Sequence, residues 1–309
     1  GLYAFWSRLL VLFLCDWRYK YKIIYKIMNN MDKKKMYQSA PLPFLGQKRM
    51  YVNEFREILK SFPEDAVYVD LFGGSGLLSH ITKHEKPNAT VVYNDFDNYR
   101  LRLANVDRTN VLLSNLREIV KDSPKHKKIT HGVREMILSK LEMEEMDGFV
   151  DYITLSSSLL FSMNYVQSLD ALRKEAMYNN VRMTDYVCDG YLNGLEIVSC
   201  DYKELVAKYH CFNNVVYLVD PPYLSTEVGA YQMYWKLSDY LDVLSILAGT
   251  SYIYFTSDKS DILELCQWLG KSHWVGNPFS EARQINMRRS VNYNSYYTDI
   301  MLYKVNKKL

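Results

Sequence analysis

The chain has 309 residues, of which 48% are hydrophobic and 24% are charged, and its formal net charge is +3. This composition is that of an ordinary soluble protein, and the length suits one large domain or a core domain with a sizeable insertion. The small net charge excludes the strongly basic class in which total charge alone indicates a nucleic-acid partner, although it is compatible with a local basic face.

The cysteines argue against a metal centre and against a disulfide framework. Their number is odd, no two are spaced as Cys-x-x-Cys, and the spacings match neither a zinc site nor a disulfide pattern. We therefore expect reduced, mostly buried thiols in a cytoplasmic protein that holds no metal. The five are Cys15, Cys188, Cys200, Cys211 and Cys266.

The N-terminal segment differs from the rest of the chain. The apolar run at residues 9–15 is far shorter than the roughly 18 residues that indicate a membrane span, and no small-residue cleavage site of a secretory signal follows it. The chain begins with Gly1, whereas methionines at positions 28, 31 and 36 are each suited to start translation. We expect residues 1–36 to be an extension outside the fold, and we expect no membrane association.

The first organised elements predict a βαβ unit. Residues 53–61 show the apolar spacing of one helical face. The dense apolar run at residues 66–72 is typical of a strand that is buried on both faces. A glycine-rich turn, a helix from about residue 77 and a second strand at residues 90–93 follow, so we expect a parallel sheet.

The residue pattern changes between residues 99 and 190. Long polar helical patterns and basic clusters replace the strands rich in valine and isoleucine. The α/β pattern then resumes, with strands expected at residues 195–201, 214–220, 252–257 and 300–303. The whole predicts an α/β fold with a Rossmann-like mixed sheet, formed by residues 37–98 and 191–309 and interrupted by a mostly helical insertion at residues 99–190.

The strongest chemical signal is the sequence Asp-Pro-Pro-Tyr at residues 220–223, directly after an expected strand. Ligand sites in open α/β sheets lie beyond the carboxyl ends of strands. An aromatic amine such as adenine N6 is a poor nucleophile, and acceptors on both of its N–H groups favour a lone pair that points at an electrophile. Asp220 supplies one acceptor and the Pro221 carbonyl the other, while Tyr223 offers a face on which an extruded base stacks. The predicted catalytic residues are Asp220, Pro221, Pro222 and Tyr223.

A second signal is the glycine-rich turn that follows the strand at residues 66–72. Glycines let the backbone approach a ligand closely and turn sharply into a helix, while a kinase or NTPase loop would need a lysine that is missing here. About 20 residues further on, Asp95 ends the next strand at the spacing where a carboxylate binds ribose hydroxyls. Together they predict a cofactor that contains adenosine, although Asp95 also suits a capped turn. The predicted cofactor-binding residues of the turn are Asp70, Phe72, Gly73, Gly74, Ser75 and Gly76.

In their order along the chain, these motifs resemble the Dam-like DNA adenine-N6 methyltransferases of the D12 class, or alpha group, from about residue 41 to residue 305. The resemblance implies a class I methyltransferase fold, S-adenosylmethionine as the methyl donor and double-stranded DNA as the substrate. It also allows a cognate restriction endonuclease as a partner. In this family the target-recognition insertion lies between the cofactor motif and the catalytic motif, as residues 99–190 do here.

The resemblance also implies roles for residues outside the two motifs. Lys48, in the sequence Pro-Phe-Leu-Gly-Gln-Lys-Arg, matches the lysine that contacts the cofactor and the region of the target base, although the family more often has two glycines before it. Asp201 matches the acid that binds the cofactor's adenine amino group, and Tyr202 matches its aromatic neighbour. Two alternatives stay open, a surface position for Lys48 and a helix N-cap for Asp201. Phe44 and Phe96 complete the predicted cofactor site.

Target recognition is expected from basic residues of the insertion and from a second group near the C-terminus. A stretch at residues 156–164, in which polar and apolar residues alternate, is also expected to approach DNA. Methylation of cytosine N4, RNA or a protein amino group, and a non-catalytic DNA-binding subunit with the same fold, are the alternatives. The basic residues are Arg100, Arg102, Arg108, Lys125, Lys127, Lys128, Arg134, Lys140, Arg173, Lys174 and Arg182, followed near the C-terminus by Arg283, Arg288, Arg289 and Asn292.

Overall fold

The computed structural model describes residues 36–161, 164–222, 235–272, 276–292 and 295–306. The predictions for the N-terminal extension, for Cys15 and for Tyr223 therefore concern residues outside the described ranges. None of the helices in the described part of the chain combines the length and the apolar character that a membrane crossing needs.

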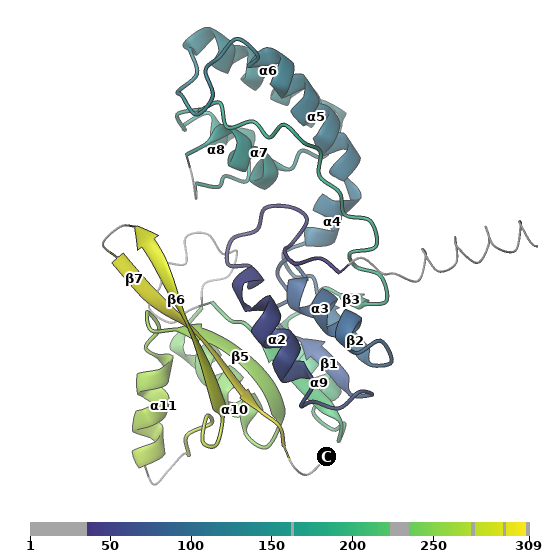
Figure 1. Ribbon diagram of the computed structural model, residues 1–309, viewed down its shortest axis with the longest axis vertical. Helices are drawn as coiled ribbons and strands as arrows, with labels where there is room; N and C mark the ends of the chain where they lie inside the picture. Colours follow the sequence, from purple (N-terminus) through teal and green to yellow (C-terminus); the bar gives the residue numbers. More distant parts are fainter. Residues whose placement is uncertain (1–35, 162–163, 223–234, 273–275, 293–294, 307–309) are drawn as a thin grey trace, which may run out of the picture. The chain divides into compact units, whose positions relative to one another are not determined.

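The described residues form a seven-stranded sheet in the order β3-β2-β1-β4-β5-β7-β6 (Figure 1). Strands β1 to β5 pair in parallel, and β7 pairs antiparallel with both β5 and β6. This mixed sheet confirms the predicted Rossmann-like α/β fold class. The strands are β1 (Val67–Asp70), β2 (Thr90–Asn94), β3 (Glu196–Val198), β4 (Val215–Val219), β5 (Ser251–Ser257), β6 (Arg283–Asn292) and β7 (Ser295–Lys304).

Helices cover both faces of the sheet, which is why β4 and β5 are buried along their whole length. On one face Phe55 of α2 packs in a cluster with Val216 of β4. On the other face Leu244 of α10 packs in a cluster with Tyr217 of β4, because neighbouring strand residues point to opposite sides. The first face carries η1 (Arg49–Tyr51), α2 (Val52–Leu59) and α3 (Leu77–Glu85), and the second carries α9 (Tyr202–Tyr209), α10 (Leu237–Leu247) and α11 (Ile262–Lys271).

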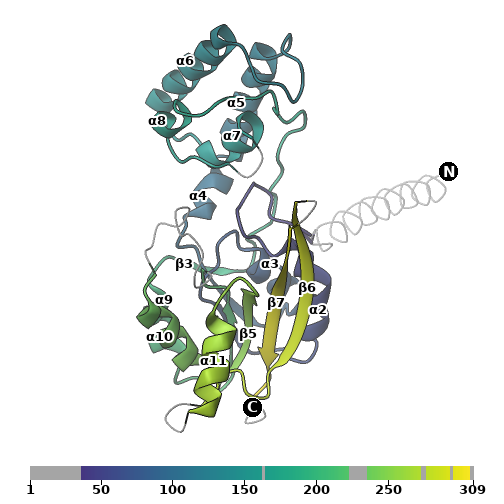
Figure 2. The same cartoon turned by 90° about the vertical axis from the view of Figure 1, so that its left-hand side faces the viewer.

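In the described part of the chain between β2 and β3, five helices have an apolar core of their own (Figures 1 and 2). Leu113, Leu141 and Leu155 are fully buried in it. Tyr37 and Leu42, which precede η1, belong to the same cluster, so the insertion shares its core with the segment that leads into the sheet. The helices are α4 (Tyr99–Ala104), α5 (Val106–Ile119), α6 (His131–Asp147), α7 (Tyr152–Leu159) and α8 (Leu169–Leu172).

The C-terminal hairpin and β3 differ from the sequence-based prediction. β3 ends at Val198, so that Asp201 lies beyond it and begins α9. β7 is longer than the predicted strand at residues 300–303, and β6 was not predicted at all. β6 is an edge strand in which exposed polar residues alternate with half-buried ones, and it therefore lacks the dense apolar run that marks the central strands.

Candidate active site

The predicted motifs meet at the carboxyl edge of the sheet, where the parallel strands β1 to β4 end. The loops that follow these four strands surround a cavity of about 210 Å³, which is closed on another side by the segment before η1. Parallel strands end at one edge, and this explains why motifs that are far apart in the sequence come together. Of the predicted site residues, those that line the cavity are Phe44, Lys48, Phe72, Gly73, Gly74, Ser75, Phe96, Asp201, Tyr202, Asp220, Pro221 and Pro222.

The glycine-rich turn after β1 lines the cavity, and the space on the other side of Gly73 is already filled. A Cβ atom on Gly73 would lie 2.3 Å from the ring of Tyr93 and 2.7 Å from the carbonyl oxygen of Asn94. Gly76 has a φ of +73° and is the N-cap residue of α3. Gly76 and Asp70 do not line the cavity, and Asp70 instead accepts a 2.7 Å hydrogen bond from Ser79 beneath the turn. Burial raises the pKa of Asp70 to about 7.

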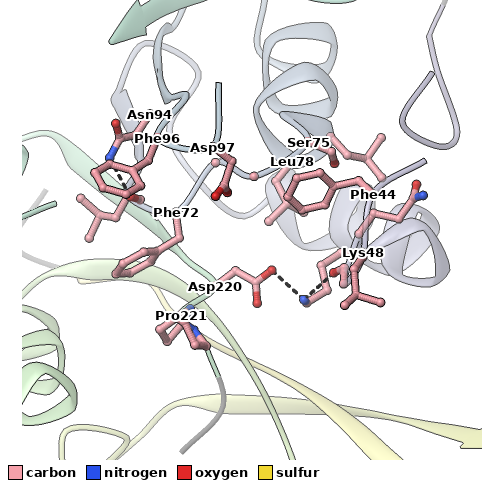
Figure 3. Close-up of a pocket in the computed structure, with 18 of the residues that line it drawn as sticks. Phe44, Lys48, Phe72, Ser75, Leu78, Asn94, Phe96, Asp97, Asp220 and Pro221 are labelled. Carbon is pink, nitrogen blue, oxygen red and sulfur yellow. Dashed lines mark hydrogen bonds and ion pairs between the residues drawn. The ribbon is translucent and has the colours of Figure 1, made fainter. Parts of the chain in front are cut away.

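Asp220 forms an ion pair with Lys48 in the wall of the cavity (Figure 3). The Lys48 Nζ atom lies 2.6 Å from Asp220 Oδ2 and donates a 2.9 Å hydrogen bond to the Gly46 carbonyl. Lys48 is 8% exposed, which rules out the surface position that the sequence left open. Burial raises the pKa of Asp220 above its ordinary value, the Lys48 ammonium opposes this rise, and the Asp299 carboxylate adds to it.

Aromatic side chains line another part of the cavity. The rings of Tyr202 and Trp235 stack with centroids 5.6 Å apart, and Phe72 lies 5.1 Å from Tyr202. Asp201 lines the cavity beside them, and its carboxylate also accepts a 2.8 Å hydrogen bond from the backbone N–H of Lys203. The N-cap alternative for Asp201 is therefore confirmed, and the same residue remains available to a ligand.

The two carboxylates after β2 lie in different environments. Asp95 is 3% exposed and does not line the cavity, because it accepts hydrogen bonds from the backbone N–H groups of Tyr99 and Arg100 and from the Tyr93 hydroxyl. Asp97 lines the cavity, and Figure 3 shows its carboxylate on the side of Asp220. The sequence indicated Asp95 because an acid about 20 residues after the glycine-rich turn often binds ribose. This separation does not show which of two nearby carboxylates faces a ligand.

Several lining residues were not predicted from the sequence as part of the pocket. Asn94 donates to the carbonyls of Leu71 and Cys200, both at 3.0 Å, and so joins the loops after β1 and β3. Arg289, expected only to approach DNA, donates a 2.7 Å hydrogen bond to Asp299 in the cavity wall. Asn94 follows an expected strand directly and Arg289 belongs to the basic C-terminal group, and these are the positions in the sequence that could have indicated them. Among the residues that line the pocket without having been predicted to do so are Asn94, Asp97, Trp235, Arg289, Tyr297 and Asp299.

Two expectations about the insertion are wrong in part. Arg102 is 5% exposed and forms a buried ion pair with Asp151, so its guanidinium is not available to DNA. In the described part of residues 156–164, Ser156 and Ser158 are buried on α7, whereas Phe161 is exposed. Both errors have one cause, since polar residues that satisfy each other inside a helical core resemble surface residues in the sequence.

Comparison with known proteins agrees with this geometry. The model of the D12 class N6 adenine-specific DNA methyltransferase family matches residues 44–245. The chain belongs to this family. A Haemophilus influenzae protein that is named as a candidate methyltransferase is 36% identical over 288 residues, which cover 89% of this chain and 95% of that protein. As a D12 enzyme, the chain methylates adenine N6 in DNA with S-adenosylmethionine as the methyl donor, which confirms the resemblance identified from the motifs.

The cavity suits the methyl donor of a D12 methyltransferase. S-adenosylmethionine combines a flat adenine, a ribose diol and a charged amino acid. Aromatic rings at Phe72, Tyr202 and Trp235 match the flat base, and the carboxylates of Asp97 and Asp201 are acceptors for hydroxyl and amino groups. Among the described residues, no three side chains of the metal-binding types lie close enough together to hold a metal ion.

Proposed function

We propose that residues 220–222 hold the N6 amine of an adenine that has been flipped out of double-stranded DNA into the cavity. The observation that supports this most directly is the position of Asp220, whose carboxylate is 18% exposed in the cavity while the neighbouring prolines line the same wall. Asp220 accepts a hydrogen bond from one N6–H group, and the Pro221 carbonyl accepts from the other. Both acceptors concentrate the nitrogen lone pair on the side opposite to them.

Lys48 keeps the acceptor ionised. A buried carboxylate tends to take up a proton, and the ammonium group at 2.6 Å opposes this tendency. S-adenosylmethionine, when bound, supplies a methyl group on a positively charged sulfur. As the new C–N bond forms, the bond between that methyl group and sulfur would break, and the sulfur would leave as a neutral thioether. The Asp220 carboxylate would stabilise the positive charge that arises on the amine and would receive the proton that the nitrogen then loses.

At the other end of the cavity, Asp97 binds the ribose hydroxyls, and Asp201 binds the adenine amino group next to the rings of Phe72 and Tyr202. Asp95, to which the sequence assigns the ribose, supports the loop that carries Asp97. Tyr223 remains the residue proposed to stack on the flipped base.

The helical insertion at residues 99–190 is proposed to select the target sequence through its exposed basic residues. The proposed DNA methylation takes place in the cytoplasm, where double-stranded DNA and the methyl donor are both present. A cognate restriction endonuclease is the protein partner that fits such an activity, because it would cut the sequence that methylation protects.

The proposed residue roles are tested by expressing the full chain in a host without adenine methylation and analysing the nucleosides of its DNA. The wild type is expected to produce N6-methyladenine, and Asp220→Ala to lower kcat by at least about 10³-fold while S-adenosylmethionine binds normally. Substantial activity in this variant would reject Asp220 as the acceptor. N4-methylcytosine in place of N6-methyladenine would show that the cavity holds a different base.

A further inference from the structure

The β6–β7 hairpin extends past the end of the neighbouring strand at the carboxyl edge of the sheet. Pairing between β5 and β7 stops at Ser257 and Asp299. Pairing between β6 and β7 continues beyond this point, from Arg288 and Thr298 to Asn292 and Ser295. Four residues of β7 therefore extend over the edge at which the cavity lies, which corresponds to roughly 13 Å at 3.3 Å per residue. Figures 1 and 2 both show the hairpin projecting beyond β5.

One face of this extension belongs to the cavity. Arg289 and Tyr297, which pair with each other, line it together with Asp299. The Arg289 charge is balanced by Asp299 at 2.7 Å. A base held at Asp220 would therefore have this face of the hairpin as one of its walls.

Two cations rest on tyrosine rings of the extension: Arg288 of β6, and Lys259 from the turn after β5. The Arg288 guanidinium lies 4.2 Å from the centroid of Tyr296, and Lys259 Nζ lies 4.2 Å from the centroid of Tyr297. Tyr296 is 52% exposed. Since successive strand residues point to opposite faces, Arg288 projects away from the face that Arg289 presents to the cavity.

These two cations differ from the Arg289 beside them in having no carboxylate partner among the described residues. Arg289 and Arg102 are paired with carboxylates, whereas no carboxylate in the described part of the chain lies within 4.0 Å of Arg288 or Lys259. Asp258, next to Lys259 in the sequence, is the nearest acidic neighbour along the chain. An aromatic ring orders a cation without neutralising it, so that its charge stays available to an anion.

We propose that Arg288 on the overhanging part of the hairpin, together with Lys259 in the turn after β5, binds the DNA phosphates that flank the flipped adenine. The inference rests on the proposed entry of the base into the cavity. A flipped base stays joined to its sugar and to the phosphate on each side, so these phosphates lie at the mouth of the cavity when the base lies within it. Phosphate contacts position a DNA strand without reading its sequence, which suits residues that lie beside the catalytic carboxylate and outside the insertion.

Salt dependence distinguishes this role from a purely structural one. Each phosphate contact that is lost makes the slope of log K against log salt concentration shallower by about 0.9. A cation that only stabilises the hairpin changes the melting temperature and leaves the slope unaltered.

The experiment measures DNA binding by the full chain at several salt concentrations, in the presence of S-adenosylmethionine. Arg288→Gln and Lys259→Gln are each expected to weaken binding several-fold and to make the slope shallower by about 0.9, with an unchanged Kd for the methyl donor. Arg288→Lys, which keeps the charge, should retain the slope of the wild type. Arg288 and Lys259 lie on different elements. If one of the two glutamine variants fails to fold, the salt dependence of the other still tests the proposal.

Lys208→Gln is the matched control. Lys208 also rests on a tyrosine ring, 5.0 Å from the centroid of Tyr209, but at the end of α9 that lies away from the carboxyl edge. Its removal should leave the slope unaltered. Unchanged slopes in both Arg288→Gln and Lys259→Gln would overturn the proposal if the wild type methylates DNA. Absence of DNA methylation by the wild type would instead reject the function on which the proposal rests.

Discussion

Two ion pairs in different regions of the molecule join residues that are far apart in the sequence. Lys48 and Asp220 meet at 2.6 Å beside the sheet, and Arg102 and Asp151 meet at 3.0 Å between α4 and α7 of the insertion. Each joins a basic residue to a carboxylate in a largely buried position. The surroundings of the two carboxylates differ, and this difference separates a structural contact from the one that we propose to be catalytic.

The carboxylate of Asp151 is enclosed on all sides by its partners. Its side chain is 1% exposed, and it accepts hydrogen bonds from Arg102 and from both the N–H and the hydroxyl group of Thr154. Arg102 also donates a 2.7 Å hydrogen bond to the Pro43 carbonyl, next to Phe44 of the cavity wall. Asp220, by contrast, is 18% exposed in the cavity. A carboxylate that is fully engaged supports the fold, and one that faces a cavity can accept a substrate hydrogen bond.

The largest expected change in stability follows from removing the carboxylate of the enclosed ion pair. Asp151→Ala leaves the Arg102 charge buried and uncompensated, and we expect the free energy of unfolding to fall by about 3–5 kcal/mol. Urea denaturation measures it. Glu57→Ala is the control, since the Lys60–Glu57 pair is exposed and its loss should change stability by less than about 1 kcal/mol. A loss below 1 kcal/mol for Asp151→Ala as well would mean that the two regions do not differ in this way.

Removing the cation from the open pair is expected to change the pH dependence of the reaction. In the proposed reaction the ionised form of Asp220 is the acceptor. Lys48 lowers the pKa of Asp220, so Lys48→Met is expected to raise this pKa. Activity is lost as the pH falls through the pKa, and the acid limb of the kcat/KM profile therefore moves to higher pH. Below the pKa, kcat/KM falls about tenfold for a rise of one in the pKa. Lys48→Arg should keep the acid limb near that of the wild type, and an unmoved limb in Lys48→Met would argue against the proposed role.

The smallest expected effect concerns the neighbouring carboxylates after β2, which repeat the contrast between an enclosed and an open group. Asp97→Asn should raise the Kd for S-adenosylmethionine about tenfold, which corresponds to ~1.4 kcal/mol. Asp95→Asn should leave this Kd nearly unchanged and lower stability by about 1 kcal/mol, because the carboxylate caps the start of α4. Isothermal titration and thermal unfolding measure the two effects. If Asp95→Asn weakened binding more than Asp97→Asn, the assignment from sequence spacing would be the better one.

Local patterns in the chain were sufficient to predict the centre of the fold and the place of the chemistry. Strands β1, β2, β4 and β5 were predicted because a strand buried on both faces must be almost entirely apolar. The glycine-rich turn was recognisable from its glycines directly after a strand. The structure gives the reason for one of them, since a residue with a Cβ atom at position 73 would collide with Tyr93. The sequence Asp-Pro-Pro-Tyr after β4 was enough to indicate an aromatic amine as the substrate, and the family match confirms adenine in DNA.

The tertiary structure alone showed which of several similar residues face the cavity. Asp95 and Asp97 are alike in the sequence, and the turn after β2 encloses one and exposes the other. A surface position stayed open for Lys48 and a DNA contact was expected for Arg102, until their carboxylate partners were located 172 and 49 residues away. β6 was missed because an edge strand keeps one side in water and needs little apolar sequence. Partners distant along the chain leave no local periodicity, and their roles emerge only when folding brings them into contact.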